Sequence, residues 1–123
     1  MLATHVRLAT AKYMTEKDKI IIAVTTCPSD EVARRIAEAL VGERLAACVN
    51  RISGVQSTYI WKGEALTDSE VLLIIKTTEA RFSALQVRLM DLHPYELPEL
   101  VAIPVCAGAE KYLAWVADTV KSS

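Results

Sequence analysis

The chain has 123 residues, of which 52% are hydrophobic and 24% are charged. This composition is typical of one globular domain with a sizeable core, not of a disordered or fibrous protein. The formal net charge is -1, which gives no electrostatic footprint for nucleic acid or an anionic membrane, and we expect neither as a partner.

The beginning of the chain differs in composition from the rest. Its first fifteen residues include His5, Arg7 and Lys12 but no acidic side chain. We interpret residues 1–17 as an N-terminal extension and residues 18–123 as one folded domain. A basic, acid-free extension fits a transit peptide, whereas a loosely ordered or docked arm is the simpler alternative.

The first predicted elements alternate between strand and helix. Residues 19–26 form a short β-branched run, which predicts a buried strand. Ser29 can cap a helix that we expect to end near Gly42. Residues 47–61 then have an extended pattern, and Gly54 predicts a bulge where the alternation changes parity.

A ribbon and a second helix follow. Residues 62–64 (KGE) predict a hairpin turn, after which residues 70–78 (EVLLIIKTT) form a strand antiparallel to the preceding one. The second helix opens at Thr78 and ends at or before His93, because Pro94 disfavours a helical residue in front of it.

The last predicted elements are a strand over residues 99–105 and a helix over residues 109–120. The complete order is β-α-β-β-α-β followed by one more helix. This is the split βαβ order of ferredoxin-like folds, so we predict an α+β domain with an antiparallel sheet and its helices on one face.

The predicted strands are more apolar than such a sheet requires. Residues 20–24 and 71–75 are apolar on both faces, although a sheet covered on one face should alternate apolar and polar side chains. At about 25 cal/mol per Å² of buried apolar area, another copy of the chain would bind strongly to the uncovered face. We therefore predict an obligate oligomer; the alternative is that residues 1–17 fold back over this face.

The loop over residues 92–99 has the densest group of chemically active side chains. His93, Tyr95, Glu96 and Glu99 stand close together around two prolines, and imidazole and carboxylate groups can bind a divalent cation. Alternatively, His93 complements the helix end or lies at a subunit junction. In an enzyme, His93 would be a general base beside Glu99.

Three further residues are candidates for a ligand pocket or an intersubunit contact. Tyr59 and Trp61 lie two residues apart and could wall a pocket or anchor an interface, although packing alone would also explain them. Lys76 ends an apolar strand, which fits an ion pair with Glu96 or Glu99, an anion contact, or a lysine that reaches solvent.

The cysteines Cys27, Cys48 and Cys106 are odd in number and far apart, so they predict neither a disulfide framework nor a zinc site. We expect a reducing, cytoplasmic location. Cys48 has apolar neighbours and is either a small core residue or a soft-metal ligand. Cys27 precedes the first helix, where backbone dipoles could favour a reactive or metal-binding thiolate, or its position is incidental.

Five short motifs occur in order between residue 19 and the last helix. They are Thr26-Cys27-Pro28, residues 43–50 (ERLAACVN), Tyr59-x-Trp61-x-Gly63, residues 75–78 (IKTT) and residues 93–99 (HPYELPE). Together they make the chain resemble the CutA divalent-cation tolerance family over the whole core domain.

The resemblance implies a ferredoxin-like fold packed as a homotrimer, similar to the PII signalling proteins, with the sheets turned inward. It also implies tolerance of divalent metals, copper especially, with Cys48 and His93 at positions implicated in metal contact in bacterial relatives. Some relatives have a second histidine where this chain has Leu92 and another cysteine where it has Thr25.

Two functional hypotheses follow. The first is a homotrimeric divalent-cation tolerance protein that binds or responds to ions such as copper through His93, Cys48, Glu96 and Glu99. The alternative is a PII-like effector-binding or scaffold protein with a small anion in its intersubunit clefts. We expect no enzyme, because the chain has no Gly-rich phosphate loop and no Gly-x-Ser-x-Gly motif.

Overall fold

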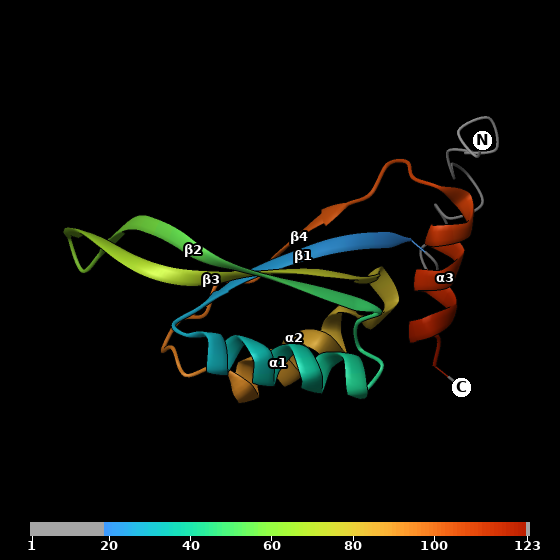
Figure 1. The fold of residues 1–123 in the computed structure, drawn as a ribbon, viewed down its shortest axis with the longest axis horizontal. Helices are drawn as coiled ribbons and strands as arrows, with labels where there is room; N and C mark the ends of the chain where they lie inside the picture. The colour runs from blue at the N-terminus through green and yellow to red at the C-terminus, as the bar shows by residue number, and fades with distance from the viewer. Residues whose placement is uncertain (1–18, 123) are drawn as a thin grey trace.

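The computed structural model describes residues 19–122, so the predicted extension over residues 1–17 lies outside it. The elements in chain order (Figure 1) are β1 (Ile20–Cys27), α1 (Asp30–Gly42), β2 (Cys48–Trp61), β3 (Glu64–Thr78), the short 3₁₀ helix η3 (Glu79–Arg81), α2 (Phe82–Leu92), β4 (Val101–Pro104) and α3 (Glu110–Val120).

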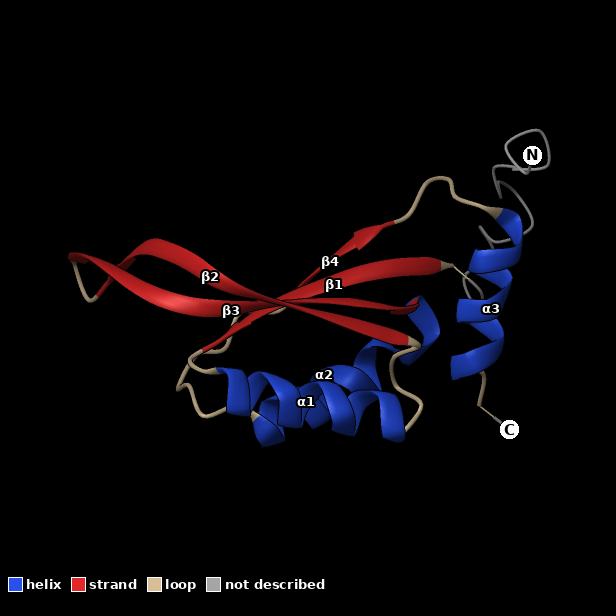
Figure 2. Cartoon of the chain, in the orientation of Figure 1, coloured by secondary structure: helices blue, strands red, loops and turns tan. Residues whose placement is uncertain are grey.

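The strands form one antiparallel sheet in the order β2-β3-β1-β4. Helices α1 and α2 lie together on one face of it, and α3 stands across one end (Figure 2). The predicted α+β, ferredoxin-like order with an additional C-terminal helix is confirmed. No helix in the described part of the chain is long and apolar enough to cross a membrane.

Local signals account for the helix boundaries. The Ser29 hydroxyl accepts a hydrogen bond from the Val32 amide at 3.2 Å, which is the predicted cap of α1. The second helix begins later than predicted, because η3 separates Thr78 from the first residue of α2. Helix α2 ends at Leu92, directly before the His93-Pro94 pair, as expected.

The β2–β3 ribbon is longer than predicted. Strand β3 begins at Glu64, whereas the sequence predicted Glu70. Residues 64–69 are mostly polar, but their backbone pairs with the end of β2 and so extends the strand. The register between the strands shifts between Ile52 and Val55, and Gly54 has a φ of +79°, so the predicted bulge is confirmed. The ribbon extends past α1 and α2 (Figure 1).

Strand β4 is shorter than the predicted strand over residues 99–105. It pairs with β1 only over Val101–Pro104. The backbone carbonyl of Glu99 instead accepts a hydrogen bond from the Thr25 hydroxyl at 2.6 Å. The chain before Val101 is therefore fixed by a side chain of β1 and not by the backbone pairing of the sheet.

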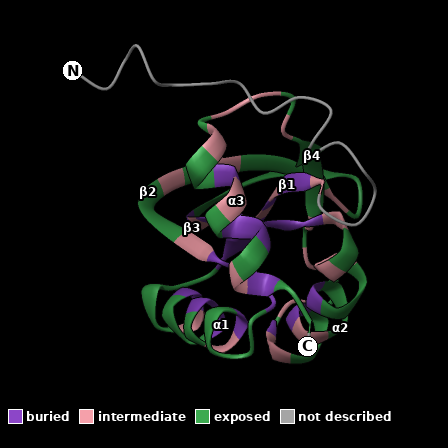
Figure 3. Ribbon diagram, turned by 90° about the vertical axis from the view of Figure 1, so that its right-hand side faces the viewer, coloured by how far each residue is buried: buried purple, intermediate pink, exposed green. Residues whose placement is uncertain are grey.

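The main core lies between the sheet and the two helices, where Figure 3 shows buried segments facing one another. Leu73 and Ile75 of β3 pack there with Ile36 and Leu40 of α1 and with Leu89 of α2, and all five are fully buried. A second cluster joins Ile20 and Ala47 to the inner side of α3. Burial of these side chains supplies most of the driving force for folding.

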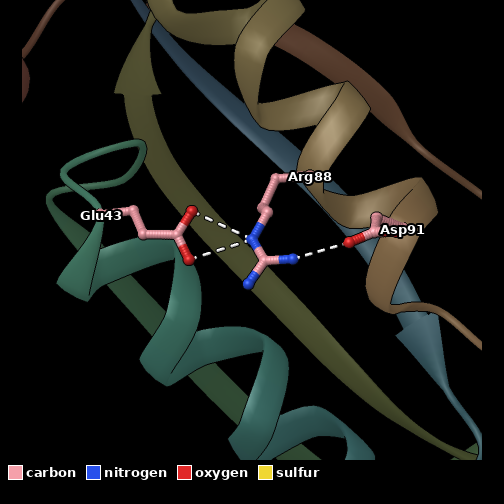
Figure 4. Close-up of polar contacts among 3 residues, drawn as sticks. All are labelled: Glu43, Arg88 and Asp91. Atoms are coloured by element: carbon pink, nitrogen blue, oxygen red, sulfur yellow. Dashed lines mark hydrogen bonds and ion pairs between the residues drawn. The ribbon is translucent and has the colours of Figure 1, made fainter.

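One arginine of α2 contacts the residue that caps the C-terminal end of α1 (Figure 4). Arg88 of α2 donates from Nε to both carboxylate oxygens of Glu43 at 3.0 Å and from Nη1 to Asp91 at 2.8 Å. The bond to Glu43 is the main reason that the pKa of Arg88 is raised. These side chains are largely exposed, so the network orients the helices more than it stabilises them.

The opposite face of the sheet is mostly uncovered, and we call it the open face. Residues that are directly paired in a sheet share a face, as do residues two apart in a strand. By that rule, the apolar residues of the open face include Ile22, Val24, Ile52, Leu72, Ile74, Val101 and Ile103. Val101 is 52% exposed and Ile103 is 56% exposed, so apolar side chains remain in contact with water on this face.

Candidate functional site

A pocket of about 650 Å³ lies where the β2–β3 ribbon leaves the body of the sheet. The ribbon supplies one wall, and the loop after α2 supplies the other. The lining residues are Thr26, Ser57, Thr58, Tyr59, Ile60, Trp61, Asp68, Glu70, Tyr95, Glu96, Leu97 and Glu99. We call this the acidic pocket, because four of these residues are Asp or Glu and none of the described lining residues is Lys or Arg.

Two phenols hold two of the carboxylates in place. The Tyr95 hydroxyl donates to Glu70 at 2.6 Å, and the Tyr59 hydroxyl donates to Asp68. Burial, followed by the bond to Glu70, raises the pKa of Tyr95, and the bond to Asp68 raises the pKa of Tyr59. Both phenols therefore stay protonated near neutral pH and remain donors to their carboxylates.

The other two carboxylates are free to accept a partner. Glu96 and Glu99 lie in the loop between α2 and β4 and are exposed. Neither side chain makes a hydrogen bond or ion pair within the described residues. Thr26, which is buried, also lines the pocket.

His93 is buried behind the pocket, and both of its ring nitrogens are occupied. Nε2 lies 2.8 Å from the Thr26 carbonyl, which can only accept, so Nε2 carries the proton. Nδ1 accepts a hydrogen bond from the Tyr95 amide at 3.2 Å, and the two rings are in contact. His93 therefore positions Tyr95 and has no free lone pair for a metal or for the general-base role considered above.

The four predicted metal ligands do not converge within one chain. Cys48 of β2 pairs with Lys76 of β3, and Lys76 pairs with Ile22 of β1. Ile22 is four residues along β1 from the Thr26 that His93 contacts, which is roughly 13 Å at ~3.3 Å per residue. Among the described residues, no three His, Cys, Asp or Glu side chains are grouped so as to hold a metal ion. Sequence proximity brings Glu96 and Glu99 together, whereas the sheet separates Cys48 from them.

Lys76 does not make its expected ion pair with Glu96 or Glu99 within the chain. Its ammonium group instead donates to the side-chain oxygen of Asn50 at 2.5 Å. Lys76 is six residues from Glu70 on the same strand, which is roughly 20 Å at ~3.3 Å per residue. The acidic pocket and Lys76 thus lie at opposite ends of the open face.

Cys27 is a core residue and not a reactive thiolate. Its side chain is fully buried in the main cluster. Burial, with a smaller contribution from the charge of Glu70, raises the pKa of Cys27 to about 11. Of the two interpretations of Cys27, the raised pKa therefore favours an incidental position before α1 over a reactive thiolate. All three cysteines are free.

Asp68 and Glu70 are pocket residues that the sequence interpretation missed. They lie on β3, and their side chains point to the open face with Lys76 because residues two apart share a face. The available signal was Glu70 itself, an acid at the start of an otherwise apolar strand. It is only 9% exposed, and burial of a charged group requires a partner, which Tyr95 supplies.

Comparison with known proteins identifies close relatives. A divalent-cation tolerance protein CutA of Thermus thermophilus is 50% identical over 97 residues, which cover 79% of this chain and 94% of that protein. Human protein CutA is 47% identical over 100 residues. That match covers 81% of this chain but 56% of the human protein, and a chloroplastic CutA of rice is covered to 58%, so the chain spans little more than half of these relatives.

Solved structures agree with this relation. CutA from Xylella fastidiosa superposes with a TM-score of 0.82 at 41% identity, covering 84% of this chain and 99% of that one. The Thermus thermophilus protein superposes with a TM-score of 0.80 at 49% identity, covering 81% and 97%. The sequence model of the CutA1 divalent ion tolerance protein family matches residues 21–119. This chain therefore belongs to the CutA1 divalent ion tolerance protein family.

Proposed function

We propose that this member of the family works as a homotrimer that binds or responds to divalent cations through its acidic pocket. The observation that carries the proposal is the charge of the pocket, which is lined by four Asp or Glu residues and by no described Lys or Arg. Such a lining attracts cations and repels anions. Glu96 and Glu99 are the ligands we propose, since neither is bound to another described side chain.

The available donors indicate which cations fit. Carboxylate and hydroxyl oxygens suit magnesium, calcium and manganese, whereas copper favours imidazole and sulfur. The pocket offers oxygen atoms, and the His93 ring and the Cys48 thiol are not directed at it. The residues of one chain therefore fit an oxygen-bound divalent cation better than copper, and a copper response would need another source of ligands.

The homotrimer is supported by the open face. Its apolar side chains lie in adjacent rows of all four strands, and α1 and α2 cover only the opposite face. Exposed apolar areas of this kind mark subunit contacts in soluble proteins, and closed symmetric oligomers are the usual solution. Packing the open faces of three copies around one axis would remove these side chains from water.

A PII-like effector protein remains the alternative. It needs Lys76 beside the Tyr95 loop, and within one chain these lie at opposite ends of the open face. A small anion could therefore be bound only where two copies meet. The acidic lining disfavours an anion in the pocket itself, so we rank this alternative second.

A combined measurement of mass and metal content tests the proposal. Light scattering on the tag-free protein should give three times the chain mass. Isothermal titration with manganese and with copper should show saturable binding that Glu96→Gln with Glu99→Gln weakens by at least tenfold. The matched control is Glu38→Gln with Glu31→Gln, which neutralises two exposed acids on α1.

Three outcomes would each contradict part of the proposal. A solution mass of one chain would contradict the proposed homotrimer. Equal cation binding by the pocket variant and the control would show that the pocket is not the cation site. Binding of a nucleotide or a small acid, with no cation binding, would favour the effector alternative.

We also place the protein in the cytoplasm. Its three free cysteines support a reducing compartment. Relatives differ in location, since the rice protein is named chloroplastic and the Archaeoglobus fulgidus protein is named periplasmic. Cell fractionation with an antibody to the native chain would decide, and recovery in an organelle or a periplasmic fraction would contradict the placement.

A further inference from the structure

Within residues 19–122, Lys76 has no charged partner. It is half-buried, its one hydrogen-bond partner among these residues is the neutral side chain of Asn50, and it forms no ion pair with any of them. Among the described strands, it is the one basic residue in the rows of the open face. Covering this face with another copy would desolvate the ammonium group, which is costly unless a carboxylate meets it.

The acidic pocket has the complementary problem at the other end of the same face. Asp68 and Glu70 are held by Tyr59 and Tyr95, and the remaining two carboxylates have no described partner. Concentrated negative charge of this kind also needs a counter-charge when water is removed. Lys76 of the same chain cannot supply it, because about six residues of extended strand separate Lys76 from Glu70.

The open face thus has an acidic end, an apolar middle and a basic end. In a closed threefold ring every contact is heterologous, so the basic end of one face can meet the acidic end of the next copy while the apolar middles enclose the axis. A ring with like ends together would place lysine against lysine and acid against acid, which charge repulsion disfavours. Charge therefore selects the direction in which each face lies in the ring.

We infer that Lys76 of one copy enters the acidic pocket of a neighbouring copy and pairs there with Glu96 or Glu99. The pocket is then a composite site, complete only in the assembly. Glu96 and Glu99 are the acceptors because the other two carboxylates are already bonded to phenols. This inference rests on the proposed homotrimer and does not depend on which cation the pocket binds.

The contact has a consequence for cation binding. Lys76 and a divalent cation would use the same carboxylates, so they compete. Replacing the ammonium group by an uncharged side chain of similar length should strengthen cation binding, provided that the trimer persists. Lys76→Met tests this, since it keeps the apolar stem of the side chain.

Charge reversal tests the contact directly. Lys76→Glu should raise the concentration at which the trimer dissociates by at least about tenfold, because it places acid against acid. Adding Glu96→Lys or Glu99→Lys to that variant should restore assembly, since each pair is then reversed. The control is Arg35→Glu, the same charge change at an exposed position of α1 on the opposite layer. Sedimentation velocity over a dilution series measures the assembly of Lys76→Glu, of its two double variants and of Arg35→Glu. Circular dichroism checks that each variant is folded.

Carbodiimide cross-linking gives a second measurement that does not depend on a loss of stability. This reagent joins a lysine to a carboxylate only when they are in contact. We expect covalent dimers and trimers of the parent, with Lys76 linked to Glu96 or Glu99 in peptide mass spectra, and their loss in Lys76→Met.

The outcomes separate this inference from the proposal on which it rests. A monomeric parent overturns the homotrimer itself. A trimeric parent in which Lys76→Glu behaves like Arg35→Glu, or in which Lys76 cross-links elsewhere, overturns the inference alone. Manganese binding is measured on the same samples, so a trimer with the Lys76 contact but no cation binding would leave the inference standing and remove the cation role.

Discussion

On the face of the sheet covered by α1 and α2, Leu73 and Ile75 of β3 are fully buried, whereas on the open face their neighbours Leu72 and Ile74 are only partly covered. The four residues are similar in size and hydrophobicity and lie in one strand. What separates them is the alternation of side chains in a strand, which sends each to a different environment. The covered face is completed by this chain, whereas apolar side chains of the open face stay partly exposed.

The polar groups on the two faces differ in the same way. On the covered face, Thr77 donates to the Leu45 carbonyl at 2.7 Å, and no buried side-chain polar atom of the described residues lacks a partner. On the open face, neither Lys76 nor the acidic pocket has a counter-charge among the described residues. A face whose polar groups are satisfied within the chain serves folding, whereas one with unsatisfied charges at its ends serves recognition.

The largest effect is expected from a charge in the middle of the open face. Ile74→Asp should abolish the trimer and leave a folded monomer, because three unpaired carboxylates would be buried together. Light scattering would show the mass of one chain, with the helix signal retained. Val87→Asp is the control, since Val87 is 72% exposed on α2. A trimer of Ile74→Asp would mean that the open face is not the contact.

The second prediction concerns the covered face. Leu73→Ala should lower the free energy of unfolding by ~2–5 kcal/mol, because it leaves a cavity in a close-packed core. Denaturation in urea, followed by circular dichroism, measures the loss. In the matched variant Ile74→Ala, the loss in free energy of unfolding should grow as the protein is diluted, because dilution separates the subunits of the proposed trimer. If the two variants showed the same dependence on protein concentration, the two faces would not differ as described.

The third prediction uses pH to examine the covered face. Folding raises the pKa of Cys27 from its ordinary 9.0 to about 11, so burial favours the neutral thiol. The resulting contribution to stability is complete below pH 9 and is lost as the pH rises towards 11. The stability of Cys27→Ala should therefore fall less steeply over this range than that of the parent.

Urea denaturation at several pH values measures this slope for both proteins. Cys106→Ala is the control, because Cys106 is exposed and should not change the slope. A parent and a Cys27→Ala variant with parallel profiles above pH 9 would contradict the buried, neutral thiol.

The smallest effect is expected outside both faces. Arg88→Gln removes the exposed network with Glu43 and Asp91, and we expect a change in Tm close to the error of the measurement. Any loss should disappear at high salt, because exposed ion pairs are screened. A large loss in Tm that persists in high salt would show that the contacts of Arg88 with Glu43 and Asp91 contribute substantially to the stability of the fold.

The positions of the site residues were harder to predict than the fold. Residues 93–99 are adjacent in sequence, so Glu96 and Glu99 could be placed in one loop from the start. Cys48 was grouped with them although β2 holds it at the far end of the sheet. For His93 the sequence leaves a metal ligand, a helix-end residue and a subunit junction open, and only the structure shows that its ring bonds to the Thr26 carbonyl, 67 residues away in the chain.

The sequence alone determined the order of the elements, the cap at Ser29, the bulge at Gly54 and the excess of apolar residues in the strands. These features depend on neighbours a few residues apart, through alternation, helix capping and backbone conformation. Only the tertiary structure decided that Tyr95 reaches Glu70, that His93 is enclosed and that Lys76 stands apart from the acids. Those contacts join segments distant in the chain, and their geometry follows from strand register and packing, which no local pattern specifies.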